Sequence, residues 1–143
     1  MSDTLKSQRA VLSFFQGETR CGVYARYIQE LMAVPLLTPV PGRDALRGLF
    51  LYKGCIVPVF SFAGLCEEAE TAAEGICMVL REDGGEPIGI TVAGVDQLFA
   101  EGAASLADMA DVEYGSARMS SMPTPDGVIL MLDVGRTYQA LTR

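Results

Sequence analysis

Short apolar stretches rich in Val, Ile, Leu and Phe recur along the chain and are separated by turns that contain Gly, Pro or Asp. This pattern is typical of many short strands in a barrel or sandwich, and helical periodicity is scarce. Three turns, at residues 16–19, 83–86 and 125–127, contain a glycine that can adopt the positive φ of a tight hairpin. The expected strands are residues 11–15, 22–25, 28–35, 48–51, 55–62, 76–81, 88–95 and 128–134.

Three parts of the chain depart from this pattern of short apolar strands. Pro58 lies inside the run at residues 55–62, and because proline has no N–H to donate, we expect an edge or bulged strand there rather than a central one. Residues 101–121 are small and polar, which predicts a long connection with one helical turn around 105–109. The tail after Asp133 is expected to close the molecule with a short helix.

The apolar pattern also repeats within the chain. Two passages that begin at Gly17 and Gly85 each contain a second glycine, followed by apolar residues six and nine positions later. These are Gly22 with Ile28 and Leu31, and Gly89 with Val95 and Leu98. A glycine-turned apolar strand follows in each half, at 53–62 and 126–134. We therefore predict two copies of one β unit sharing a core, since each copy is too small to be stable alone.

Length and charge narrow the class of protein. The chain has 143 residues, half of them apolar, so one domain can bury a real core without metals or disulfides. The net charge is −7 and the eleven basic residues are scattered, which argues against a nucleic-acid partner. No apolar run has the length of a signal peptide or of a membrane span, so we expect a cytoplasmic protein without direct membrane insertion.

The chemistry available to the chain is limited because it contains no histidine. This removes Ser-His-Asp and Cys-His catalysis and most zinc and iron sites, and leaves a carboxylate-only or lysine-based enzyme open. An enzyme with Lys53 or Cys55 as nucleophile would need an oriented base, which no histidine can supply, so we expect no enzyme, metal or cofactor. The four cysteines include no C-x-x-C pair and are expected to be buried free thiols. The acidic residues are expected to lie in solvated loops: Glu67, Glu68, Glu70, Asp96, Asp108, Asp111 and Glu113.

Five segments, taken in order, resemble the CheW-like domain family. They are V-L-S-F-F-Q-G-E-T-R-C-G-V at 11–23, I-Q-E-L at 28–31, R-G-L-F-L-Y-K-G-C-I-V-P-V at 47–59, G-I-T-V-A-G-V at 89–95 and D-G-V-I-L-M-L-D-V at 126–134. The resemblance implies an all-β fold of two intimately packed five-stranded β-barrel subdomains that share an apolar core, with a short C-terminal helix. Residues 9–143 would form this single domain, after a flexible N-terminus at 1–8.

The resemblance also implies a function. Proteins of this family are non-enzymatic adaptors that couple chemotaxis-type receptors to a histidine kinase in bacterial signal transduction. The implied partners are the regulatory domain of a CheA-type kinase and the cytoplasmic tip of a methyl-accepting chemotaxis-type receptor. Such a protein would be cytoplasmic and recruited to membrane-associated receptor arrays.

The family's binding residues transfer to eight positions. Leu51, Tyr52, Lys53 and Gly54 would bind the receptor, and Ile28, Gln29, Glu30 and Gly48 would bind the kinase. The alternative is that Lys53 is a solvated turn residue, Ile28 a core residue and Gly48 a turn glycine.

Four departures from the family pattern leave other functions open. Leu51 replaces an asparagine, Lys53 an arginine, Ala93 an aspartate and Ser61 another aspartate. A divergent copy could bind only the kinase and compete with a normal adaptor. A second alternative is a regulatory β-barrel that binds a small ligand in an apolar groove between its halves.

Overall fold

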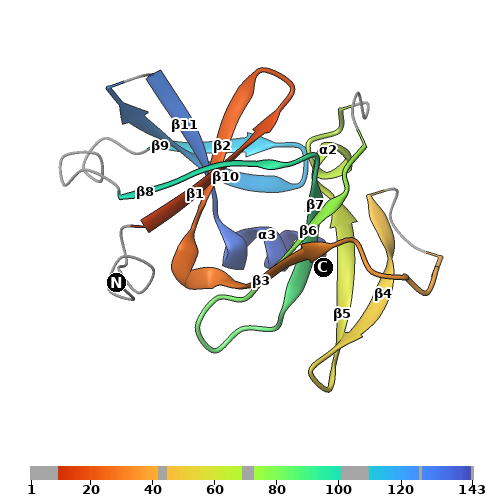
Figure 1. Cartoon of the computed structure of the whole chain (residues 1–143). Coiled ribbons are helices and arrows are strands. Elements are labelled where there is room, and N and C mark those ends of the chain that lie inside the picture. Colours follow the sequence, from red (N-terminus) through yellow and green to blue (C-terminus); the bar gives the residue numbers. More distant parts are fainter. Residues whose placement is uncertain (1–9, 42–44, 69–72, 101–109, 126, 143) are drawn as a thin grey trace.

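The computed structural model describes residues 10–41, 45–68, 73–100, 110–125 and 127–142; the expected flexible N-terminus lies outside them. These residues form two β-sheets and three short helices, of which α2 and α3 are labelled in Figure 1. The elements are β1 (Ala10–Gln16), β2 (Thr19–Tyr24), η1 (Ala25–Tyr27), β3 (Ile28–Ala33), β4 (Leu46–Tyr52), β5 (Cys55–Ser61), α2 (Phe62–Leu65), β6 (Ile76–Leu80), β7 (Ile88–Val92), β8 (Val95–Ala100), β9 (Ala110–Tyr114), β10 (Ala117–Thr124), β11 (Gly127–Leu132) and α3 (Val134–Leu141).

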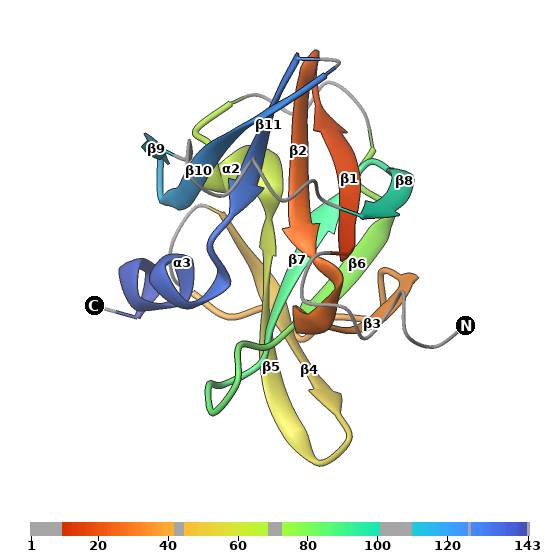
Figure 2. The ribbon, with the colours of Figure 1, turned by 90° about the vertical axis from the view of Figure 1, so that its left-hand side faces the viewer.

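The strands form a six-stranded sheet, in the order β8-β1-β2-β11-β10-β9, and a five-stranded sheet, in the order β3-β6-β7-β5-β4. Each sheet contains one parallel pair, β2 with β11 and β5 with β7, and its other pairs are antiparallel. The tips of the β10–β11 and β4–β5 hairpins lie at opposite ends of the molecule (Figure 2). The all-β prediction is therefore correct.

The predicted internal repeat is confirmed by the strand connections. β1 and β2 pair in the six-stranded sheet and β3 then crosses to the five-stranded sheet, whereas β6 and β7 pair in the five-stranded sheet and β8 crosses back. The crossing strands begin six residues after Gly22 and Gly89, at Ile28 and Val95. Each half continues with a hairpin whose second strand leads into a helix, β4–β5–α2 or β10–β11–α3. Each sheet thus contains strands from both halves.

The two repeat glycines lie where neighbouring strands approach most closely. A Cβ atom on Gly22 would come within 2.9 Å of both Met131 Sδ and Val11 Cγ1, and one on Gly89 within 2.9 Å of Val59 Cγ2. Met131 and Val59 belong to the strands that pair in parallel with the strands of Gly22 and Gly89, respectively. The glycines are required because of this lack of space, since neither has a positive φ.

The main apolar core lies between the two sheets and receives side chains from both halves, including the edge-to-face pair Phe14 and Phe62. A smaller cluster lies on the other face of each sheet, around Met122 and Ile129 in one and around Val59 and Val79 in the other. The predicted shared core is confirmed. Closed five-stranded barrels are not, because one sheet has six strands and both ladders have open edges among the described residues.

The prediction of a long connection at residues 101–121 is wrong for its second part. β9 and most of β10 occupy residues 110–121, and the expected helical turn at 105–109 lies outside the described residues. β8 was also not recognised as a strand of its own, separate from β7. Both missed strands lie at an edge of the six-stranded sheet, where polar side chains such as Asp96, Asp111 and Glu113 remain in solvent. Strands of this kind lack the apolar run that marks a buried strand.

Of the two positions expected for Pro58, an edge strand is wrong, since β5 lies between β4 and β7. The pairing of β4 with β5 does have an irregular register, as the alternative of a bulge predicted, and the irregularity lies between Leu46 and Gly48 of β4. Pro58 is tolerated because it pairs with Leu49 of β4, while the pairing of β5 with β7 begins only at Val59. The missing N–H therefore precedes the stretch of β5 that has a neighbour on both sides.

Candidate functional site

The residues predicted to bind a receptor lie at the tip of the β4–β5 hairpin, which projects away from the rest of the fold (Figure 2). The two-residue turn consists of Lys53, with a φ of 48°, and Gly54, with a φ of 83°. Two successive positive φ angles define the type I′ turn that suits the twist of antiparallel strands. The turn fixes the register of the hairpin, in which Tyr52 lies opposite Cys55 and Leu51 opposite Ile56.

An apolar strip covers one face of this hairpin. Leu51 is 70% exposed and its cross-strand neighbour Ile56 is 66% exposed. Next along the strands, the half-buried pair Leu49 and Pro58 continues the same face. Two large aliphatic side chains held side by side in solvent on a hydrogen-bonded hairpin form a surface that needs little ordering when it binds a partner.

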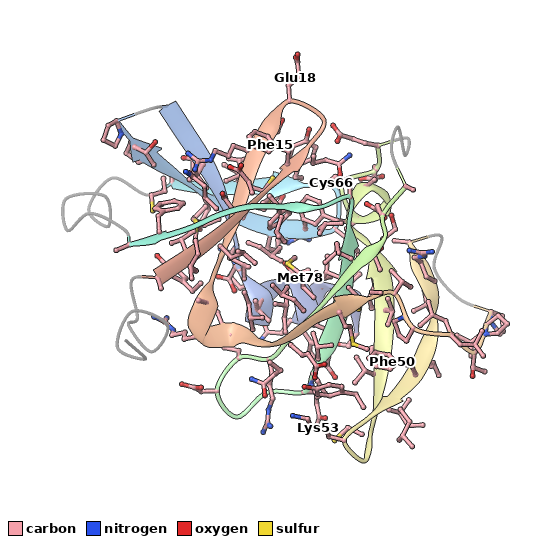
Figure 3. The ribbon with its side chains drawn as sticks, in the orientation of Figure 1. Phe15, Glu18, Phe50, Lys53, Cys66 and Met78 are labelled. Atoms are coloured by element: carbon pink, nitrogen blue, oxygen red, sulfur yellow. The ribbon has the colours of Figure 1, made fainter. Side chains whose placement is uncertain are left out.

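Tyr52 lies on the other face of the hairpin and contributes little to this strip. Its ring packs against the cluster of Val59, Cys77 and Val79, and its hydroxyl group is buried and has no hydrogen-bond partner in the part of the chain that the structure describes. The Lys53 ammonium lies 5.3 Å from the centre of the Tyr52 ring, so the lysine is positioned by a cation–π contact. Lys53 is exposed at the extreme end of the hairpin (Figure 3).

Gly48 has a structural role within β4. Its φ of 150° is unfavourable for other residues, and a Cβ atom would lie 2.8 Å from the carbonyl oxygen of Thr38. The segment that follows β3 forms a bridge with β4 at this point, where Thr38 and Leu49 exchange backbone hydrogen bonds of 2.8 and 2.9 Å. Any side chain at position 48 would displace this segment, so a kinase contact by Gly48 itself has no support in the geometry.

Ile28, Gln29 and Glu30 lie at the start of β3, the edge strand at the other end of the same ladder. Ile28 packs against the main core, whereas Gln29, Glu30 and the following Leu31 are exposed. The predicted binding residues are therefore brought into two separate surfaces on one sheet, the β4–β5 hairpin tip and the β3 edge. Of the two, the hairpin tip has the more exposed apolar side chains.

Sequence reasoning missed two exposed apolar residues near the hairpin. Ile56 was included in a strand but not in the site, and Leu36, which is 97% exposed, follows β3 just before the bridge to β4. The alternation along β5 could have identified Ile56, because Val57 and Val59 are buried and Ile56 faces the opposite way. No pattern in the sequence distinguishes Leu36 from a core residue.

The cysteines behave as expected with one exception. Cys21, Cys66 and Cys77 are buried free thiols, and burial raises the pKa of Cys77 to about 11 and that of Cys21 to about 12. Cys55 is exposed beside the hairpin turn, which corrects the prediction of a fourth buried thiol. Among the described residues, no group of three His, Cys, Asp or Glu side chains is placed to hold a metal ion.

A protein-family model for the CheW-like domain matches residues 10–141, which include both sheets, the hairpin tip and the β3 edge. The chain belongs to the CheW-like domain family. This is a family of chemotaxis scaffold and adaptor proteins in signal transduction, as the sequence resemblance indicated. No curated protein matches the chain.

The fold of this CheW-like domain is similar to that of a solved structure, the scaffolding protein TtCheW from Thermoanaerobacter tengcongensis. The TM-score is 0.73 at 14% sequence identity, and the match covers 88% of this chain and 89% of the other. In the described part of this CheW-like domain, no helix has the length and apolar character needed to cross a membrane.

Proposed function

We propose that this CheW-like domain is a non-enzymatic scaffold that couples a chemotaxis-type receptor to a CheA-type histidine kinase. It would act in the cytoplasm, at membrane-associated receptor arrays. The observation that carries this proposal is the presence of two separate exposed surfaces on one hydrogen-bonded sheet, the β4–β5 hairpin tip and the β3 edge. A sheet that presents two surfaces at fixed positions can hold two partners at once.

The hairpin tip is proposed to bind the receptor. Leu51 and Ile56 offer an apolar strip, and Lys53 places a positive charge at its end. These features complement the apolar face of a helix that carries an acidic residue at its border, the kind of surface that a helical receptor tip presents. Leu51 in place of the family's asparagine makes this strip more apolar, and Lys53 in place of arginine provides charge without a planar fork.

The β3 edge is proposed to bind the regulatory domain of the kinase. Gln29, Glu30 and Leu31 are exposed there, and no ion pair of Glu30 occurs among the described residues. An unpaired carboxylate at the border of an interface affects the choice of partner and the association rate more than it affects the fold. The kinase surface is therefore expected to carry a basic residue opposite Glu30.

The proposal is tested by titrating the purified chain calorimetrically against the kinase regulatory domain and, separately, against a receptor signalling-tip fragment. We expect micromolar binding to both, because signalling contacts of modest area are weak. Leu51→Asp should weaken only receptor binding, and Val128→Asp, at an exposed apolar position on the equivalent β10–β11 hairpin, should leave it unchanged. Glu30→Lys should weaken only kinase binding, with Glu18→Lys at the other end of the molecule as its control.

Each outcome of these titrations has a clear meaning. Binding to neither fragment would refute the proposed coupling. Binding to the kinase alone would replace it with the competitor function that the departures at Leu51 and Ala93 leave open. A melting temperature that falls in step with binding in Glu30→Lys would show that Glu30 acts on the fold rather than on the partner.

A further inference from the structure

The outer faces of the two sheets differ in a way that the proposed function does not explain. In the five-stranded sheet this face is apolar, with Val59, Cys77 and Val79 at its centre. In the six-stranded sheet the apolar cluster around Met122 and Ile129 gives way to polar residues toward the β1–β2 turn. Ser13 is fully buried there, at the position in β1 that corresponds to Val79 in β6.

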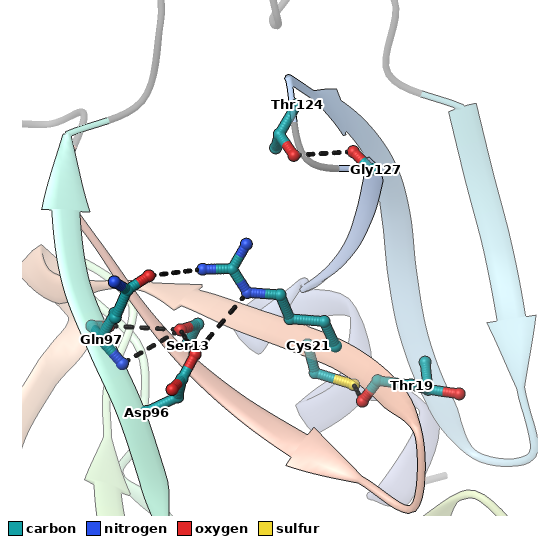
Figure 4. Close-up of polar contacts among 8 residues, drawn as sticks. Ser13, Thr19, Cys21, Asp96, Gln97, Thr124 and Gly127 are labelled. Atoms are coloured by element: carbon teal, nitrogen blue, oxygen red, sulfur yellow. Dashed lines mark hydrogen bonds and ion pairs between the residues drawn. The ribbon is translucent and has the colours of Figure 1, made fainter.

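These polar residues form one network that links β1, β2 and the edge strand β8 (Figure 4). Ser13 Oγ donates to Asp96 Oδ2 at 3.2 Å and accepts from the Gln97 backbone N–H at 3.1 Å. Arg20 Nη2 donates to Gln97 Oε1 at 2.9 Å, and Arg20 Nε lies 3.8 Å from Asp96 Oδ2. The Arg20 guanidinium also lies 5.2 Å from the centre of the Phe99 ring. Three partners, Gln97, Asp96 and Phe99, therefore hold the guanidinium in a fixed position.

The network forms one wall of a cavity of about 770 Å³ that opens between the β1–β2 turn, β8 and the β10–β11 hairpin. Such a volume is within the range of small-molecule sites, roughly 300–1,000 Å³. Apolar side chains form the remaining wall: Phe15, which is 45% exposed, Val128, which is 58% exposed, and the half-buried Leu130. Glu18 lies at the rim, at the opposite end of the molecule from Lys53 (Figure 3).

The hydrogen-bonding capacity of Arg20 is only partly used. Its Nε is buried 3.8 Å from Asp96 Oδ2 and is therefore closed to a ligand, whereas no described residue forms a hydrogen bond with its Nη1, whose two N–H groups remain unused. A fixed arginine with unused donors binds carboxylates well. Asp96 and Glu18 add two negative charges to the single positive charge of Arg20, so the cavity also favours a cationic group.

The geometry points to a binding site for a free α-amino acid with an aliphatic or aromatic side chain. The carboxylate of the ligand would accept hydrogen bonds from Arg20, its ammonium would lie toward Asp96 and Glu18, and its side chain would contact Phe15, Val128 and Leu130. This site goes beyond the proposed scaffold function and lies away from both of its surfaces. It differs from the apolar groove between the halves that the sequence suggested for a ligand.

The test is a calorimetric titration of the full chain with L-leucine and L-phenylalanine, for which we expect saturable binding with a dissociation constant of about 1 mM or lower. Two relatives of leucine separate the roles of the charges: 4-methylpentanoate lacks the ammonium and 3-methylbutylamine lacks the carboxylate. Each should bind at least about tenfold more weakly than leucine, as the loss of a charge-assisted hydrogen bond predicts. Equal binding of either relative, or no saturable binding of the amino acids, would overturn the assignment.

Two variants locate the site. Arg20→Gln should abolish leucine binding, whereas Arg81→Gln, at an exposed arginine outside the cavity, should leave it unchanged. Because Arg20 also supports the fold, Val128→Glu provides a second variant at an exposed position, where the added carboxylate repels that of the ligand. Leucine binding that survives both Arg20→Gln and Val128→Glu would refute this location. Kinase and receptor titrations of Val128→Glu should match the unmodified chain, so failure of this site is distinguishable from failure of the scaffold proposal.

Discussion

Residues 10–65 and residues 76–141 follow the same plan of strands, apart from the additional strand β9 in the second half. Both halves end with a strand that leads into a helix, but they cap that helix with different side chains. In each half a strand leads into a helix whose first N–H groups need acceptors. Ser61 accepts from the Gly64 N–H at the start of α2, and Asp133 accepts from the Arg136 N–H at the start of α3. The same position in each half is thus an N-cap.

A glutamate completes each cap, but only Glu74, at the cap of α2, is buried. Glu74 accepts from the Ala63 N–H at 3.0 Å and from the hydroxyl groups of Ser61 and Thr91 at 2.6 and 3.0 Å. In the second half Glu82 accepts from the Gly135 N–H at 2.7 Å and is partly exposed. The comparison shows that the burial of the glutamate decides which residue can serve as the N-cap beside it. A serine beside Glu74 donates a hydrogen bond, whereas an aspartate there would place two buried carboxylates together.

Removing the two cap glutamates is expected to change the free energy of unfolding more than any other substitution that tests this comparison. Glu74→Ala removes an acceptor shared by three buried donors and should lower the free energy of unfolding by about 3 kcal/mol. Glu82→Ala should lower it by about 1 kcal/mol, because water can replace the lost acceptor. Urea denaturation of both variants measures the difference. Equal losses would mean that the two caps are equivalent after all.

The repeat glycines give the next largest effect. Gly22→Ala should lower the free energy of unfolding by about 2–3 kcal/mol, because the added methyl group meets Met131, Val11 and Ile129 side chains within 3.2 Å. Gly89→Ala should lower it by about 1–2 kcal/mol, since only Val59 lies as close as 2.9 Å. Gly94→Ala, which meets nothing within 4 Å, is the control. A larger loss for Gly89→Ala would contradict the packing order.

The buried thiols predict a loss of stability in alkali. Burial raises the pKa of Cys77 to about 11, so this thiol stays protonated in the folded state while it ionises in the unfolded state above about pH 9. Its contribution is therefore complete below pH 9 and is lost as the pH rises toward 11, by about 1 kcal/mol at pH 10. Cys77→Val supplies the residue found at the equivalent position, Val11.

The measurement for the thiol is the free energy of unfolding between pH 8 and pH 10.5, a range that begins below the onset of the loss and includes most of it. Cys77→Val should show a shallower decline than the unmodified chain. Cys55→Val, at the exposed thiol, should leave the slope unchanged. Identical slopes in all three proteins would show that other groups cause the alkaline loss.

The smallest effect concerns the tip of the β4–β5 hairpin. Lys53 adopts a positive φ that Asn tolerates better, so Lys53→Asn should raise the free energy of unfolding by about 0.5 kcal/mol. The same change removes the charge proposed to bind the receptor and should weaken that binding. Lys53→Gln removes the charge without the conformational gain, and thermal unfolding with receptor titration compares the two. Unchanged receptor binding in both variants would remove Lys53 from the site.

Much of the fold could be predicted because buried strands leave a clear pattern. β1, β5, β6 and β11 were recognised as apolar runs, and the repeat glycines identified the two halves before any contact was known. The edge strands β8 and β9 could not be recognised, because one side of each faces solvent and its composition resembles a loop. Pro58 led to the wrong prediction of an edge strand. A proline is tolerated inside this sheet because the pairing of β5 with β7 begins only after it, at Val59, and the sequence does not show where that pairing begins.

The candidate surfaces were only partly predictable. The turn at Lys53 and Gly54 was identified from a family motif, but whether Tyr52 faces inward and Ile56 outward depends on which face of the hairpin meets the core. The association of Arg20 with Asp96 and Gln97 had no local signal at all, because these residues are distant in the chain and meet only when β8 crosses to pair with β1.

The sequence by itself determined the class of structure, the duplication and the absence of histidine chemistry, because these depend on local composition and spacing. Only the tertiary structure decided which strands form edges, which acidic residue is buried, and which arginine lines a cavity. These features arise from contacts between strands that are far apart in the sequence, such as β8 with β1 and β5 with β7. Such contacts depend on strand pairing rather than on local preference.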